Sequence, residues 1–116
     1  MSAKMKYDYE GRYVFVDRDG HKSQVRHVTL SLTDNYWFYI SEYPKNLLEL
    51  GLQRISAAKK EKNEWSSDYF IRFLLPLSQQ VIFWCHFQEK TDELIKKFNA
   101  LKRKQEKEDE TKVGEV

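Results

Sequence analysis

Basic side chains gather in one short stretch near the N-terminus, and this stretch is the first part of the chain that could bind a ligand. Its cationic members are Arg18, His21, Lys22 and Arg26, and Lys45 in a later turn could join them. A phosphate group is bound firmly only where several such cations converge. Asp17 and Asp19 lie in the same stretch and oppose its positive charge. The pattern therefore predicts a weak site for an anionic group, against the alternative of solvated loop charges.

A second basic group follows in the middle of the chain. It consists of Lys59, Lys60 and Lys62, with Trp65 shortly after them. A lysine run is most often only solvated, and the competing interpretation is attraction to an anionic membrane, worth about 1 kcal/mol per lysine near the surface. A tryptophan in a polar segment is a candidate for insertion into a membrane or a partner, unless it packs against the rim of the fold.

No residue pattern of a catalytic or metal site is present in the sequence. The three histidines, His21, His27 and His86, lie on separate segments without the spacing of a metalloprotease motif, and no serine sits in a nucleophile elbow. Cys85 is the single cysteine, which excludes an internal disulfide and a cysteine metal cluster. Its aromatic surroundings predict a buried, unreactive thiol. We expect a protein that is not an enzyme and has no cofactor and no metal.

Length and composition place the chain among small globular proteins. Its 116 residues fit one domain, and a composition of 41% hydrophobic, 15% aromatic and 33% charged residues is not that of a disordered chain. The net charge of +2 is too balanced to indicate nucleic-acid binding. There is no apolar run of membrane-spanning length and no signal peptide, so a cytoplasmic protein is expected, either whole or part of a larger protein or complex.

Alternating apolar residues predict strands through the first three quarters of the chain. Val28, Leu30 and Leu32 share one face, and Thr29 and Ser31 the other. Strands are expected over residues 12–17, 25–32, 36–40, 48–55, 68–75 and 81–87. Asp-Gly at residues 19–20 marks a tight turn, and Pro44 marks a loop over residues 42–46. Residues 57–67 are expected to form an exposed loop, with room for a short helical or strand-like piece.

One amphipathic helix follows the strands. Thr91 is its expected N-cap, and Asp92 and Glu93 lie where the helix dipole favours acids. Its apolar stripe consists of Leu94, Ile95, Phe98 and Leu101. Residues 102–116 are almost all polar or charged and have no such stripe. They are expected to fray as a charged tail, with extension of the helix as the alternative.

Three segments carry a resemblance to a known family. Residues 11–20 (GRYVFVDRDG), 26–40 (RHVTLSLTDNYWFYI) and 92–101 (DELIKKFNAL) resemble the first strand, the second and third strands, and the closing helix of the pleckstrin homology (PH) family. The resemblance implies a mainly β fold over residues 7–101. In that fold, six or seven strands form a bent antiparallel barrel or sandwich capped by one C-terminal α-helix. Phe98 stands where the family has its signature tryptophan, and its implied role is to plug one end of the barrel.

The resemblance also implies phosphoinositide binding, but the charge pattern matches the family's signature for this function only in part. Arg26 matches the arginine of the family's phosphoinositide signature, but Gln24 stands where a basic residue is expected and no lysine occurs in the first strand. The expected function is a recruitment or adaptor module in signalling, with weak binding to anionic phosphoinositide headgroups at the first strand-loop-strand unit and peripheral membrane association. The alternative is a protein–protein interaction module without lipid binding.

Overall fold

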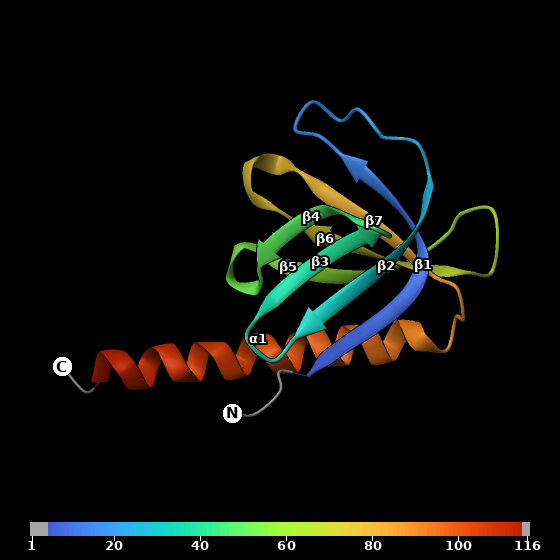
Figure 1. Ribbon diagram of the computed structural model, residues 1–116. Coiled ribbons are helices and arrows are strands. Elements are labelled where there is room, and N and C mark those ends of the chain that lie inside the picture. The colour runs from blue at the N-terminus through green and yellow to red at the C-terminus, as the bar shows by residue number, and fades with distance from the viewer. Residues whose placement is uncertain (1–4, 115–116) are drawn as a thin grey trace.

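The computed structural model describes residues 5–114, which fold into strands followed by one long helix (Figure 1). The strands are β1 (Lys6–Val16), β2 (Arg26–Thr33), β3 (Trp37–Glu42), β4 (Lys45–Gly51), β5 (Ala57–Lys62), β6 (Tyr69–Leu74) and β7 (Gln80–Cys85). Two 3-10 turns, Leu52–Arg54 and Pro76–Ser78, and the helix α1 (Lys90–Gly114) complete the chain. The described residues contain no helix that is both long and apolar enough to cross a membrane.

All seven strands belong to one antiparallel sheet in the order β4-β3-β2-β1-β7-β6-β5. β1 joins the two halves of the sheet, because Lys6–Tyr13 pairs with β2 and Gly11–Val16 pairs with β7. At Gly11, where both partners overlap, a Cβ atom would lie 2.1 Å from the carbonyl oxygen of Trp84. Only glycine permits this close approach of backbones.

The core lies between the curved sheet and α1. Phe98 is fully buried and its ring meets that of Phe73 edge to face at 5.4 Å, while Phe73 meets Phe38 in the same way at 5.0 Å. Leu94 and Leu101 of the same helical stripe are also buried. The fold class expected from the sequence is confirmed: a mainly β, seven-stranded antiparallel sheet with a C-terminal helix, consistent with a PH-like β-sandwich.

The strand expected at residues 48–55 is displaced. β4 begins at Lys45, which pairs with Glu42 across a short turn at Tyr43 and Pro44, so the expected loop over residues 42–46 is shorter than predicted. After Gly51 the chain forms a 3-10 turn instead of continuing as a strand, and Leu52 is fully buried within it. The apolar residues that suggested a strand are therefore explained by burial of this turn.

The loop expected over residues 57–67 contains a regular strand. β5 pairs with β6 along its whole length and forms one edge of the sheet, with β6 as its only partner strand in the described part of the chain. Lysine-rich strands suit such an edge, because charged side chains discourage pairing with other chains. Only residues 63–68 remain as a loop between β5 and β6.

The helix differs from the prediction at both ends. It begins at Lys90, and the buried Thr91 hydroxyl has no hydrogen-bond partner in the described part of the chain, so the expected N-cap role is wrong. Asp92 and Glu93 do lie in the first turn. α1 continues to Gly114, so the prediction that the chain frays after residue 101 is wrong for residues 102–114. Residues 115–116 lie outside the described residues.

Polar contacts hold the added turns of α1 to the sheet. The Tyr36 hydroxyl in the β2–β3 turn donates to Glu108 Oε1 at 2.6 Å, and Lys102 Nζ donates to the carbonyl oxygen of Ile55. Such contacts leave no trace in the hydrophobic pattern. Figure 1 shows the C-terminal turns of α1 extending beyond the strands.

Candidate functional site

A groove on the outside of the sheet brings together residues from two loops. This outer groove lies between the β1–β2 loop (residues 17–25) and the β5–β6 loop (residues 63–68), and its cavity volume is about 350 Å³. Its floor belongs to a second apolar cluster, separate from the main core, that consists of Val14, Val16 and Ile82 with Phe70 and Trp84 packed against them. The Phe70 and Trp84 rings lie 5.6 Å apart. The groove therefore combines an apolar floor with polar walls.

Lys22 enters this groove because of how the β1–β2 loop folds back. A single β-bridge pairs Lys22 with Val16, and facing residues of an antiparallel pair project to the same side of the sheet. Since Val16 belongs to the outer cluster, Lys22 also lies on the outer side. Ser23 fixes the bridge by hydrogen bonds with the backbone of Phe15 in both directions, at 2.8 and 2.9 Å. The turn itself uses Gly20 at φ +86°.

Lys62 and Trp65 come from the opposite wall. The Asn63 N–H donates to the Asp68 carbonyl at 2.9 Å, and Asn63 Oδ1 accepts the Trp65 N–H at 3.0 Å, so hydrogen bonds of Asn63 hold the loop. Trp65 is 91% exposed, although it lines the groove. A large aromatic side chain held in solvent on an ordered loop is a feature of binding surfaces.

The charges inside the groove are largely paired. Arg72 holds both carboxylate oxygens of Glu61, at 2.6 and 3.2 Å, and donates a third bond to Gln80 at 2.6 Å. Hydrogen bonding to Arg72 lowers the pKa of the Glu61 carboxyl below its usual value. Among the residues that the structure describes, neither Lys22 nor Lys62 forms an ion pair. Both lysines line the groove with Glu64, and Lys62 does so from the last position of β5, where it is the cross-strand neighbour of Tyr69.

Arg26 and Lys45 lie at a different place. Arg26 Nη1 donates to Glu42 Oε1 at 2.9 Å, and Lys45 is the cross-strand neighbour of Glu42. Arg26 also faces the core residue Tyr13 across the β1–β2 pair, on the opposite side of the sheet from Lys22. Of these two cations that the sequence assigned to the headgroup site, Arg26 is thus already paired with a carboxylate.

Of the remaining expected site residues, some are exposed to solvent and others contact carboxylates of the fold. Arg18 is exposed in the β1–β2 loop, and His21 Nδ1 lies 3.5 Å from Asp17 Oδ2. Lys59 is exposed on β5, whereas Lys60 pairs with Asp92 of α1 at 2.8 Å and lies 4.4 Å from the centre of the Tyr69 ring. Lys60 therefore fastens the edge strand to the helix. The expected headgroup residues do not converge on one point, and Lys22 instead joins Lys62 and Trp65 from the second group.

Two further candidates for chemistry are explained by the fold. Asp17, Asp19 and His21 form the one cluster of potential metal ligands in the described residues, but Asp17 Oδ1 accepts the backbone N–H groups of Asp19 and His21, as in an ordinary turn. Burial raises the pKa of the Cys85 thiol to about 11, and the residue is only 5% exposed. The prediction of a buried, unreactive cysteine is confirmed as far as burial is concerned.

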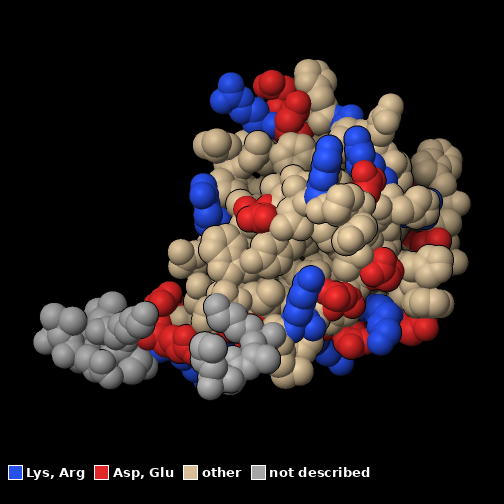
Figure 2. Space-filling view, viewed as in Figure 1, with Lys and Arg blue, Asp and Glu red and all other residues tan. Residues whose placement is uncertain are grey.

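The sequence interpretation missed the floor of the groove. Its signal was present, because β1 and β7 carry apolar residues on both faces: Val14 alternates with Tyr13, and Ile82 with Val81. A strand that is apolar on both faces is covered on both. Acidic and basic side chains are otherwise intermixed on the face seen in Figure 2, without a broad patch of one sign. No protein-family model and no curated protein matches the chain.

Proposed function

We propose that this chain is a non-enzymatic recruitment module of the PH type, which binds anionic phosphoinositide headgroups weakly and acts at the cytoplasmic surface of membranes. The single observation that carries the proposal is the outer groove, where Lys22 from the β1–β2 loop and Lys62 from the end of β5 line one cavity beside the exposed Trp65. The two ammonium groups would contact the headgroup phosphates, and Trp65 would enter the interfacial layer, where its amphipathic ring is stable.

The charge arrangement supports weak binding. Two unpaired lysines supply about 1 kcal/mol each near an anionic surface, well short of a converging cluster of arginines. Arg72 adds little to them, because the Glu61 carboxylate offsets its charge and three of its five N–H groups already bond to Glu61 and Gln80. Arg26 is paired with Glu42, and the carboxylate charge opposes a phosphate bound beside it. The contact that we propose therefore lies in the outer groove rather than beside Glu42.

Sedimentation with phosphoinositide-containing vesicles tests the proposal. Lys22→Ala and Lys62→Ala should each weaken binding roughly 5-fold, and raising the salt concentration should weaken wild-type binding further. Trp65→Ala should weaken binding with little change in its salt dependence. Lys104→Ala is the matched control, since Lys104 is an exposed lysine of α1, outside the groove. If the wild type sediments no better than the Lys22/Lys62 double variant, lipid binding in this groove is ruled out.

The second candidate is a protein-interaction module without lipid binding. It is favoured by the apolar floor, because Phe70 and Trp84 are only partly buried and a lipid headgroup would leave them uncovered. Phe70→Ala separates the two functions: it should leave vesicle binding close to wild type but abolish a partner contact on the floor. Vesicle binding that depends on Arg26 but not on Lys22 or Lys62 would move the lipid site to the Glu42 side.

A further inference from the structure

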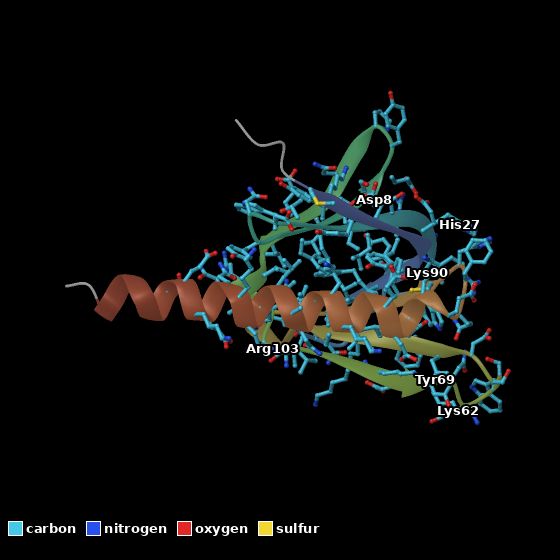
Figure 3. All side chains as sticks on the ribbon, turned by 90° about the horizontal axis from the view of Figure 1, so that it is seen from below. Asp8, His27, Lys62, Tyr69, Lys90 and Arg103 are labelled. Atoms are coloured by element: carbon cyan, nitrogen blue, oxygen red, sulfur yellow. The ribbon has the colours of Figure 1, made fainter. Side chains whose placement is uncertain are left out.

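A second hollow, distinct from the outer groove, has mainly aromatic walls. This aromatic crevice lies between the first half of β1 and the start of α1, with a cavity volume of about 320 Å³. Its aromatic residues are Tyr7, Tyr9 and Phe87, and its charged residues are Asp8, Glu10, Lys90 and Glu93. Figure 3 places Asp8 on the strand and Lys90 at the beginning of the helix, on either side of the gap. The volume lies at the small end of the range for ligand pockets, ~300–1,000 Å³.

The crevice exists because β7 ends at Cys85, opposite Gly11, whereas β1 extends past this point to its first residue, Lys6. The last contact between them is the bond from the His86 N–H to the Glu10 carbonyl, at 2.8 Å, after which the chain turns away toward α1. Among the described residues, 6–9 of β1 are consequently paired with β2 alone. Their other edge offers unpaired backbone groups next to the crevice, as an edge strand does.

The charge of the crevice is negative. Lys90 is the one lysine among its described lining residues and is paired with Glu93 at 3.0 Å, while Lys97 lies beside the crevice against Tyr7. Asp8 and Glu10 alternate with Tyr7 and Tyr9 along β1, so their carboxylates lie on the other side of the strand, where they accept hydrogen bonds from the hydroxyls of Ser31 and Thr29. Neither forms an ion pair within the described residues. Burial, and after it the charge of Glu93, raises the pKa of the Tyr9 hydroxyl to about 12. The site therefore opposes any additional negative charge.

The aromatic walls already accept a cation at one place. Lys97 Nζ of α1 lies 4.1 Å from the centre of the Tyr7 ring, which is within the range of a cation–π contact. Phe87 is 59% exposed, so its ring is available at the mouth of the crevice. Aromatic rings around a negatively charged hollow are the arrangement that binds quaternary ammonium groups, which have no N–H to donate.

We propose that the aromatic crevice binds a quaternary ammonium group, carried by a trimethylated lysine in an extended segment of a protein partner. The peptide source follows from the free edge of β1, whose backbone groups at residues 6–9 can pair with an added strand while the ammonium enters the crevice. A choline lipid offers the same ammonium but no strand. This binding is independent of the outer groove and of the function proposed for it.

Choline and 3,3-dimethylbutan-1-ol, which replaces the charged nitrogen with carbon, form the first probe pair. Binding is followed by the NMR chemical shifts of the backbone amides. Choline should shift the amide signals of Tyr7, Tyr9 and Phe87 and should bind roughly 3- to 30-fold more tightly than the neutral analogue. Phe87→Leu and Glu93→Gln should each weaken choline binding several-fold. Tyr43→Leu, a change of a 96% exposed aromatic residue outside the crevice, should leave it unchanged. Equal binding of the two probes, or shifts elsewhere in the protein, would overturn the proposal.

A peptide containing trimethyl-lysine then tests the source. It should bind more tightly than choline and should also perturb the amides of residues 6–9, whereas its unmodified lysine counterpart should bind more weakly. Tighter binding to phosphatidylcholine vesicles than to the peptide would reject a protein partner. Phe87→Leu and Glu93→Gln change exposed residues and retain the core aromatic residues. Circular dichroism would verify the fold of both variants, so a loss of binding reports on the crevice itself.

Discussion

Replacing Phe98 with alanine tests whether α1 seals one end of the sheet. The side chain is fully buried, and its ring is the last member of the edge-to-face series with Phe73 and Phe38. Truncation of a buried phenylalanine costs about 3–5 kcal/mol, which includes the cavity and an aromatic pair worth about 0.5–1.5 kcal/mol. Since a domain of this size is stable by only about 5–15 kcal/mol, Phe98→Ala should remove a large share of the total.

Urea unfolding followed by circular dichroism measures this loss. Phe98→Leu keeps most of the volume and should lose less than Phe98→Ala. Trp65→Ala is the control for removing a large aromatic side chain, and at 91% exposure it should change the unfolding free energy by no more than about 0.5 kcal/mol. A loss below about 1 kcal/mol for Phe98→Ala would refute the idea that this helix completes the core.

Further predictions concern the strand crossing, the groove and the cysteine. Gly11→Ala should destabilise the protein by about 2–3 kcal/mol or more, because its Cβ would collide with backbone; a urea midpoint equal to that of the wild type would contradict the observed register. Glu61 has a lowered pKa in the folded state, so its contribution to stability is present above its usual value of 4.5 and is lost as the pH falls through the folded value. Glu61→Gln should therefore flatten the stability change measured across that range, and an unchanged pH profile would show that the pairing with Arg72 is not formed. Cys85 should resist a thiol reagent in the native protein and react fully in urea, whereas rapid native labelling would indicate an open core.

Local patterns predicted the parts of the fold that depend on local physics. The alternation of Val28, Leu30 and Leu32 correctly identified the buried face of β2, and the stripe through Phe98 correctly identified the buried face of α1. β5 was missed because the charged residues of an edge strand resemble a loop. The end of α1 was missed because its contacts are polar and come from residues distant in sequence, such as Tyr36.

The candidate site was harder to predict than the fold. Lys22 and Lys62 were each singled out in the sequence, but in separate groups, since nothing local shows that the two loops share a groove. The Val16–Lys22 bridge decides which side of the sheet Lys22 occupies, and it depends on the conformation of the turn before it. Arg26, which matched the family signature most closely, is paired with a carboxylate supplied by β3.

The position of β1 between β2 and β7 has a consequence for how the protein folds. β2 follows β1 directly and can pair with it early, whereas β7 is the last strand to be synthesised. Until it arrives, the edge of β1 from Gly11 to Val16 stays open, and closing it requires a contact across most of the chain. Pairings of this kind slow folding and prolong the exposure of an unpaired edge. A nascent chain that stalls before β7 would therefore present an aggregation-prone strand, and completion of the C-terminal part removes that hazard.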